Sequence, residues 1–320
     1  MKKRLFIPIL IVALFVLLLS GCKKDPPVEE PVPAPAPNNG EVEEIEEDEK
    51  AQIMDDFSKV LEDKNPLMIK EFLDKNIGKL SQLDGNEMID NLEKSLIDNL
   101  DEATDNLLSK DENGELMDIA GEELFFPQEL VNEIEDEELK REVTTLFDTM
   151  YKLLNLEGSF YPIVDYARLA EEYNNYVTDE WKEYLAVKAM DSNQPPFIDG
   201  GLVISYSDLA NRILKTENYL NKYIDSSRQE EMIDSYHNKI DIYLKGIDNT
   251  PIADMSSNRI YEDVLDSYIS TSHNEGYITA SILARYVEAI EENNNIIDDN
   301  ILDLADGLIS EAVEILTEYK

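Results

Sequence analysis

The 320-residue chain has very few of the residues that build covalent cross-links and metal sites: one Cys, two His and one Trp. A single Cys excludes a disulfide within the chain and a cysteine-based zinc site. Lys and Arg are scarce as well, with 28 against 70 Asp and Glu, so the formal net charge is -42. Because so acidic a chain repels the phosphate backbone, the composition excludes sequence-independent binding of nucleic acid.

The common sequence motifs of enzymes are also missing. The sequence contains no Gly-x-Ser-x-Gly elbow, no glycine-rich phosphate loop and no His-Glu-x-x-His pair. Abundant carboxylates still allow pairs of the kind that hydrolyse glycosidic bonds. We therefore expect a non-enzymatic protein, and we keep a wall-polymer hydrolase with paired carboxylates as the weakest alternative.

The first 22 residues carry the most specific signal in the sequence. Lys2, Lys3 and Arg4 precede an uncharged apolar run over residues 5–19, and Ser20-Gly21-Cys22 follows. A basic start, a hydrophobic middle and a region of small residues are typical of a secretory signal peptide, here residues 1–21. The apolar run has 15 residues, which is short of the roughly 20 that span a membrane.

Leu19-Ser20-Gly21-Cys22 resembles the lipobox of bacterial membrane lipoproteins. The resemblance implies that the Cys22 sulfur receives a diacylglyceryl group and that the signal peptide is cut just before it. Acyl chains such as palmitate would then hold the mature N-terminus in the bilayer, and two chains anchor a protein where one binds reversibly. We expect the protein on the extracytoplasmic face of the cell membrane, and the abundance of Ile, Asn, Asp and Tyr indicates an AT-rich Gram-positive source.

Residues 22–50 are predicted to form a disordered tether. Residues 26–37 are rich in Pro, and seven of the nine residues 41–49 are acidic, so neither stretch has the apolar surface that offsets the entropy of ordering. The acidity is not confined to the tether, because 60 of the 70 acidic and 22 of the 28 basic residues lie in residues 51–320, a net charge of -38. Such a surface suits a saline or cation-rich exterior, or it attracts Ca²⁺, Mg²⁺ or a basic partner.

The remaining chain is predicted to be helical. All 16 Tyr and the Trp lie between residues 151 and 319, a break that predicts an N-terminal helical unit over 51–156 and a Tyr-rich domain over 157–320. Apolar residues recur every three or four positions over 88–107 and 130–150, with Pro127 in a first helical turn. Five helices follow, and Ser227-Arg228-Gln229-Glu230 has the form of a capping box. The prediction is an all-α fold of antiparallel helical hairpins or a short solenoid-like array.

One loop is a candidate binding site. Residues 191–201 follow a helix that carries Trp181 and Tyr184, and they combine rigid prolines with permissive glycines around an aromatic side chain. Aromatic faces and carboxylates of this kind can hold a sugar or a peptide, although a rigid connection with a buried Phe explains the same residues. The candidate residues are Trp181, Tyr184, Pro195, Pro196, Phe197, Asp199, Gly200 and Gly201.

Two weaker patterns concern metal ions. Asp111 and Asn113 precede a glycine, as in an EF-hand loop, but Ser109 and Ala120 stand where two ligating carboxylates belong. This pattern favours a plain Asn-Gly turn over a Ca²⁺ site. Asp234, His237 and Asp241 share one helical face and could bind zinc, although the pattern favours a solvated His over a zinc ligand.

These observations lead to three functional hypotheses. The first is a lipid-anchored lipoprotein of the cell envelope that acts as a non-enzymatic protein-interaction or scaffold module, with no cofactor besides the diacylglycerol at Cys22. Its partners would be the membrane and a basic or other envelope protein, and not nucleic acid. The second is an envelope lipoprotein that binds a glycan or a solute through its Tyr and Trp residues. The third is the wall-polymer hydrolase.

Overall fold

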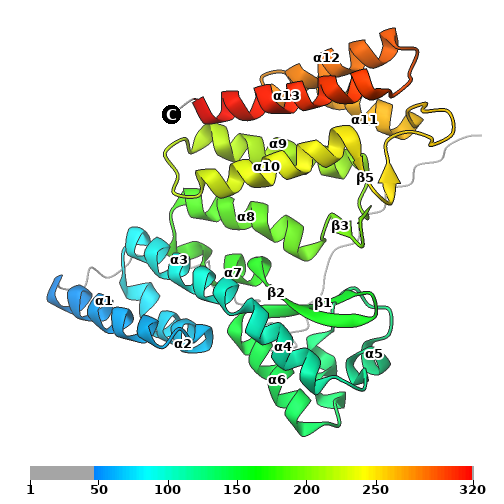
Figure 1. Cartoon of the computed structure of the whole chain (residues 1–320). Helices are drawn as coiled ribbons and strands as arrows, with labels where there is room; N and C mark the ends of the chain where they lie inside the picture. The colour runs from blue at the N-terminus through cyan, green and yellow to red at the C-terminus, as the bar shows by residue number, and fades with distance from the viewer. Residues whose placement is uncertain (1–46, 319–320) are drawn as a thin grey trace, which may run out of the picture. The chain divides into compact units, whose positions relative to one another are not determined.

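The computed structural model describes residues 47–318, which belong to one compact unit and are largely helical (Figure 1). The predicted signal peptide, the lipidation site Cys22 and nearly all of the tether lie outside the described residues. The all-α prediction is confirmed, since the strands form only short two-stranded pieces.

The N-terminal elements are α1 (Glu47–Glu62), α2 (Pro66–Asn76), η1 (Ile77–Lys79), α3 (Gln82–Asp98), α4 (Leu100–Lys110), α5 (Glu115–Ala120), η2 (Gln128–Glu133), α6 (Glu137–Thr149), β1 (Tyr151–Leu156) and β2 (Ser159–Val164). The C-terminal elements are α7 (Tyr166–Tyr173), η3 (Asn174–Tyr176), α8 (Asp179–Asn193), β3 (Phe197–Ile198), β4 (Gly201–Leu202), α9 (Tyr206–Lys222), α10 (Gln229–Lys245), β5 (Gly246–Ile247), β6 (Thr250–Pro251), α11 (Glu262–Ser272), α12 (Ile278–Glu292) and α13 (Asp299–Glu318).

Two of the predicted helical stripes are each divided in the structure. The stripe over 88–107 breaks at Asn99, which separates α3 from α4. In the second stripe, Pro127 precedes the 3-10 helix η2, and α6 begins only after Asp136, whose carboxylate accepts hydrogen bonds from two backbone N–H groups of the first turn. Apolar residues keep their spacing across both breaks, so periodicity alone did not reveal where one helix ends and the next begins.

An antiparallel hairpin, which the sequence analysis did not predict, lies at the centre of the described region. β1 and β2 pair from Tyr151 with Val164 to Leu156 with Ser159. Glu157 and Gly158 form the turn with φ values of 50° and 85°, the left-handed conformation that favours a two-residue hairpin. The predicted boundary between residues 156 and 157 falls in this turn, and the division into two domains stays a prediction.

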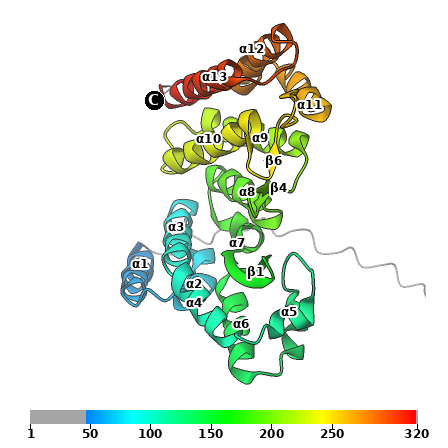
Figure 2. The same cartoon turned by 45° about the vertical axis from the view of Figure 1, so that its right-hand side comes forward.

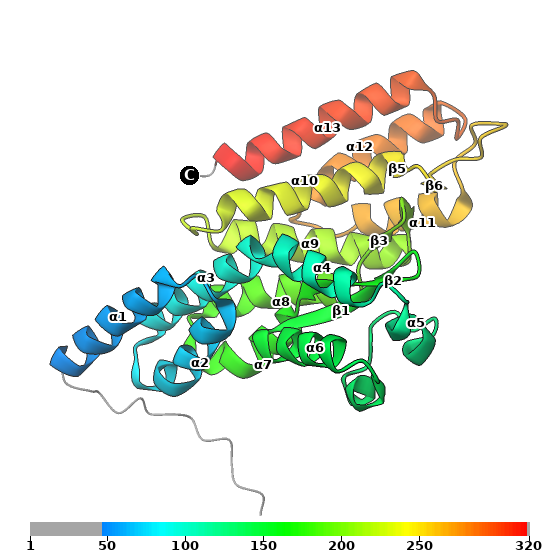
Figure 3. The ribbon, with the colours of Figure 1, turned by 60° about the horizontal axis from the view of Figure 1, so that its bottom comes forward.

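The C-terminal helices form the predicted array of antiparallel neighbours. α7 packs on α8, α9 on α10, α11 on α12, and α13 on both α10 and α12. Figure 2 shows these helices as successive layers, and Figure 3 shows α10 and α13 running side by side along their length. The hairpin β3–β4 connects α8 to α9, and the hairpin β5–β6 connects α10 to α11. Within residues 47–318, no helix combines the length and apolar character needed to cross a membrane.

Tyrosines fill the interior of this array. Tyr236, Tyr243, Tyr268 and Tyr286 are fully buried. Their hydroxyls find partners on neighbouring helices, for example Tyr236 with Thr279 Oγ1 at 2.8 Å. A buried Tyr contributes apolar area and one directional hydrogen bond, so these side chains fix the positions of adjacent helices.

Glu217 of α9 fixes α12 in a similar way. The N-cap residue of α12, Tyr277, makes no side-chain capping bond. Instead the buried Glu217 carboxylate accepts hydrogen bonds from the N–H groups of Ile278 at 2.5 Å and Thr279 at 3.0 Å, and from the Thr279 hydroxyl at 2.6 Å. The free N–H groups of one helix are thus satisfied by another helix.

Candidate functional site

The predicted binding loop forms the β3–β4 hairpin. Asp199 and Gly200 make its turn, with φ values of 51° and 70°. The hairpin is tied to the turn of β5–β6, because Asn249 donates from its backbone N–H to the Gly200 carbonyl at 2.9 Å and from its side chain to the Asp199 carbonyl at 2.5 Å. Pro196 is buried, whereas Pro195, Phe197 and Gly201 are partly buried. The loop is therefore a braced connection, and its binding role stays a prediction.

Trp181 and Tyr184 lie toward the other end of α8 from this loop. The helix has 15 residues and so is roughly 22 Å long. Trp181 is 4% exposed and Tyr184 is fully buried. The structure does not bring these two aromatic residues together with the loop, and it places them in the core.

The metal candidates have other contacts. Asp111 ends α4, and its Oδ1 accepts a hydrogen bond from the Leu116 N–H at 3.2 Å, while burial raises the pKa of its carboxyl. Asp241 pairs with Lys245 at 2.5 Å, and Asp234, His237 and Asn113 are exposed. Among residues 47–318, no group of three or more His, Cys, Asp or Glu is arranged to hold a metal ion.

Two open grooves mark the surface of the helical body. The N-terminal groove, of about 930 Å³, lies among α3, α4, α6 and the α1–α2 connection. Its polar lining includes Asn65, Asn91, Asn99, Asn106, Thr145, Lys64, Lys94, Asp63, Asp98, Glu102 and Glu142, and Tyr151 is its aromatic member.

The C-terminal groove, of about 830 Å³, lies among the end of α8, one face of α9 and the α11–α12 connection. It is lined by Met190, Asn193, Gln194, Asp208, Asn211, Arg212, Leu214, Lys215, Asn218, Asn274 and Tyr277. Both grooves therefore present carboxamides and charges, with one tyrosine each.

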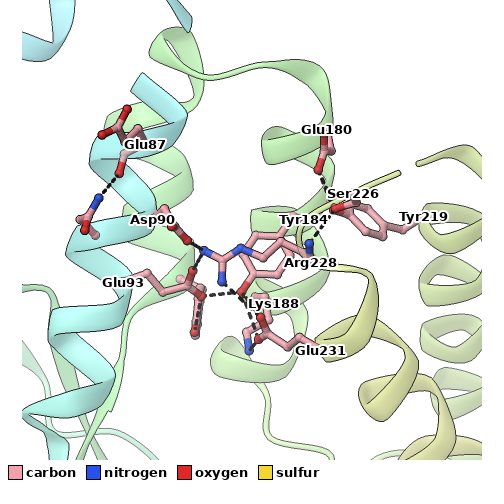
Figure 4. A network of polar contacts seen from close by, with 12 residues as sticks. Glu87, Asp90, Glu93, Glu180, Tyr184, Lys188, Tyr219, Ser226, Arg228 and Glu231 are labelled. Atoms are coloured by element: carbon pink, nitrogen blue, oxygen red, sulfur yellow. Dashed lines mark hydrogen bonds and ion pairs between the residues drawn. The ribbon is translucent and has the colours of Figure 1, made fainter. Parts of the chain in front are cut away.

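A third feature is a partly buried cluster of charges that joins α3 to α8 and α10 (Figure 4). We call it the Arg228 network, and it comprises Asp90, Glu93, Tyr166, Trp181, Tyr184, Lys188, Arg228 and Glu231. Arg228 precedes α10 as its N-cap residue, and its guanidinium lies 4.6 Å from the centre of the Trp181 ring and 5.0 Å from that of Tyr184. Trp181 and Tyr184, which were predicted to belong to a binding site, thus face a cation from their own chain.

The predicted capping box at residues 227–230 is wrong. α10 begins at Gln229, and its N-cap residue Arg228 makes no side-chain capping bond. The Ser226 hydroxyl accepts a hydrogen bond from the Arg228 N–H at 3.0 Å and donates one to Glu180 at 2.6 Å. The turn is fixed by these contacts, while the Arg228 side chain reaches across to α3 instead of folding over its own helix.

Glu93 is the buried anion of the network, with no exposed surface. Its Oε1 accepts hydrogen bonds from the hydroxyls of Tyr166 at 2.8 Å and Tyr184 at 2.5 Å. Its Oε2 lies 2.7 Å from Arg228 Nη2 and accepts no hydrogen bond of good geometry, so the contact with Arg228 is an ion pair. Burial raises the pKa of Glu93, and the charge of Arg228 and the two hydroxyls reduce that rise only in part.

Tyr184 links Glu93 to Glu231. The Tyr184 hydroxyl lies 3.0 Å from Glu231 Oε2 as well as within hydrogen-bonding distance of Glu93. A phenol donates one proton, so it can serve only one of the two carboxylates at a time. Burial would raise the pKa of Glu231, but Lys188, with Nζ at 2.6 Å from Glu231 Oε1, holds that pKa below its usual value.

The network thus has three carboxylates against two cations, and its contacts are suited to holding α3 against α8 and α10. Burial and the adjacent carboxylates raise the pKa of Tyr166 and Tyr184, which keeps both phenols protonated as donors. The sequence analysis missed Glu93 and Arg228. One signal was available, because Glu93 interrupts the buried stripe of Ile89, Leu92 and Leu96 on α3, and a charge on an apolar face needs a buried partner.

Comparisons of the chain with protein-family models, with curated proteins and with solved structures find no match.

Proposed function

We propose that the protein is a lipid-anchored lipoprotein of the cell envelope whose helical body acts as a non-enzymatic protein-interaction or scaffold module. The anchor rests on the sequence Leu19-Ser20-Gly21-Cys22, which follows a short apolar run and contains the only Cys of the chain. A tether rich in Pro and acidic residues would hold the body away from anionic lipid head groups.

The two open grooves are the observation that carries the proposed interaction role. Each has a volume of more than 800 Å³, is open to solvent and is lined mainly by carboxamide and charged side chains. Such a groove accepts an extended polar segment, because carboxamides hydrogen-bond both the N–H and the C=O of a peptide unit. The body thus offers long polar surfaces to a partner rather than one enclosed pocket.

Two alternatives are less well supported. Binding of a glycan is compatible with the carboxamides, but Trp181 and the largest buried tyrosines pack in the core and offer no ring face to a sugar. A hydrolase would need paired carboxylates at a substrate cleft. Glu93 and Glu231 are the pair that meets at Tyr184, yet they are bound to Arg228 and Lys188 and neither lines the two grooves.

The anchor is tested by replacing Cys22 with Ala. We expect the wild-type protein in the membrane fraction and labelled by an alkyne fatty acid, and the Cys22→Ala variant unlabelled, because the chain has no other thiol. Ser20→Ala keeps a small residue before the cysteine and is the matched control, which should remain lipidated. A Cys22→Ala variant that stays in the membrane fraction with the mass of the lipidated form would refute the anchor.

The interaction role is tested by photocrosslinking in cells. A benzophenone amino acid replaces Asn106 in the N-terminal groove, Asn218 in the C-terminal groove, or the exposed Asp303 of α13 as a control outside both grooves. We expect discrete protein adducts from at least one groove position and none from position 303. Adducts whose added mass is removed by wall hydrolases would instead establish the glycan-binding alternative.

A further inference from the structure

We propose that the C-terminal groove binds an extended, acidic segment of a partner polypeptide. This inference rests on the proposed interaction role and names the chemistry of the partner. It is unexpected for a body with a net charge of -38, which as a whole attracts basic molecules.

The lining of the C-terminal groove reverses the charge balance of the protein. Its described lining residues include two cations, Arg212 and Lys215, and one carboxylate, Asp208. The N-terminal groove, by contrast, has two lysines against four carboxylates. Glu217, the buried carboxylate on α9, is bound to the N-terminus of α12 by three hydrogen bonds. An anionic ligand is therefore repelled over most of the surface and attracted here.

A buried cation pair stands behind the groove. Arg212 and Lys239 have side chains that are 8% and 5% exposed, and both contact Asp191, through Nη1 at 2.9 Å and Nζ at 2.7 Å. Two cations share one carboxylate, so the cluster carries an excess positive charge in a region of low dielectric. Arg212 also donates to the Gln194 backbone carbonyl at 2.8 Å, but this carbonyl carries no net charge, so an anion bound in the groove beside Arg212 would still be attracted by the excess positive charge.

Lys215 is the residue that would meet an acidic side chain directly. It is exposed on α9, and its Nζ lies 3.3 Å from the Met190 sulfur. A thioether is a weak acceptor for an ammonium group, so the N–H donors of Lys215 are available to a stronger acceptor. A carboxylate arriving in the groove would supply one.

The carboxamides of α9 suit the backbone of an extended segment. Asn211, Lys215 and Asn218 lie on one face of the helix at intervals of four and three residues. The seven helical steps from Asn211 to Asn218 span roughly 10 Å, about the length of three extended residues. Two peptide units could thus pair with the two amides while an acidic side chain between them reaches Lys215. A sugar is less favoured, because Tyr277 is the one aromatic among the described lining residues.

The experiment selects random decapeptides from a display library on the full mature chain in detergent. Lys215→Glu is the test variant, and Lys94→Glu is its matched control, since Lys94 is an exposed lysine that lines the other groove. Urea denaturation checks that both variants are folded. We expect peptides enriched in Asp and Glu to be selected on the wild-type and Lys94→Glu proteins, and the best peptide to bind Lys215→Glu at least tenfold more weakly.

Several outcomes overturn the proposal. The first is that no peptides are enriched, and the second is that the best peptide loses the same affinity for both variants. The third is that basic peptides are enriched and bind all three proteins equally, which would show that only the general attraction of the acidic body is at work. Binding of N-acetylglucosamine oligomers that depends on Asn218 would favour a glycan instead. If acidic peptides fail while photocrosslinking still yields protein adducts, this inference is wrong and the proposed interaction role stands.

Discussion

Removal of the Arg228 guanidinium should destabilise the protein because it leaves Glu93 without its cation. Arg228→Met keeps an unbranched apolar side chain over the Trp181 ring and deletes only the charge and the donors. Glu93 has no exposed surface, and its Oε2 lies 2.7 Å from Arg228 Nη2. Breaking such a buried pair costs about 3 to 5 kcal/mol, and the lost contact of the cation with Trp181 adds about 1 kcal/mol. We expect a loss of about 5 kcal/mol at pH 7.

This loss should depend on pH with a definite sign. Burial already raises the pKa of Glu93 above 4.5, its ordinary value in an unfolded chain, and without Arg228 nothing of comparable charge opposes that rise. At pH values between the pKa of Glu93 in the unfolded chain and its pKa in the folded variant, the folded variant binds a proton at Glu93 that the unfolded chain lacks. The stability of the variant therefore falls as the pH rises through this range. The difference between the wild type and Arg228→Met should therefore be largest near pH 8 and shrink toward pH 5.

Urea denaturation followed by circular dichroism measures the free energy of unfolding at each pH. Fluorescence of Trp181, the only Trp in the chain, reports the network itself. Arg285→Met is the control, since Arg285 forms a surface pair with Glu311 in which the side chains are 51% and 43% exposed. That pair should contribute about 0 to 1 kcal/mol. An Arg228→Met loss that equals the Arg285→Met loss, or one that does not change between pH 5 and 8, would refute the assignment of Glu93 and Arg228 as a buried charge pair.

Two further predictions each compare a substitution with a matched control. Glu217→Ala leaves the first N–H groups of α12 without the carboxylate that binds them and should lower the free energy of unfolding by about 3 kcal/mol. Ser205→Ala removes an ordinary local cap of α9 and should lower it by about 1 kcal/mol. Equal losses of stability in thermal denaturation would contradict the special role of Glu217. Gly85→Ala would place a Cβ 2.0 Å from the Tyr176 carbonyl oxygen and should lower the free energy of unfolding by about 3 kcal/mol. In Gly307→Ala on α13 the new Cβ meets nothing within 4 Å, so this variant should be more stable than the wild type by about 0.5 to 1 kcal/mol. Urea midpoints check both glycine variants, and a neutral Gly85→Ala would show that α3 does not pack closely on η3.

Much of the helical architecture was predictable because it follows from periodicity. The buried residues Met88, Leu92 and Leu96 of α3 lie on the apolar face that their spacing predicts. Helix ends were less predictable, as α10 shows, where a capping-box pattern at Ser227 is not used. The hairpin β1–β2 was missed because each strand has only six residues and is fixed by pairing with other segments, including the contact of β1 with Phe125.

The position of charged residues in the core was not predictable from the local sequence. Glu93, Glu217, Arg212 and Lys239 look like solvated residues of an acidic surface, yet all four are buried. Each meets a charged or hydrogen-bonding partner from another part of the chain, as Glu93 meets Arg228 across more than 130 residues. Such pairs depend on how the helices pack, and helical periodicity does not specify them.

The sequence by itself determined the features that depend on composition and local order, namely the strong negative charge and the all-α fold. The lipoprotein anchor at Cys22 stays a prediction from the sequence. Only the tertiary structure decided which side chains meet. It placed Trp181 and Tyr184 in the core beneath Arg228, away from the loop they were expected to adjoin, and it gathered Arg212, Lys215 and the carboxamides into a groove whose charge opposes that of the whole body. The reason is that a charge balance or a groove belongs to surfaces brought together from several helices, and no single segment of the chain contains it.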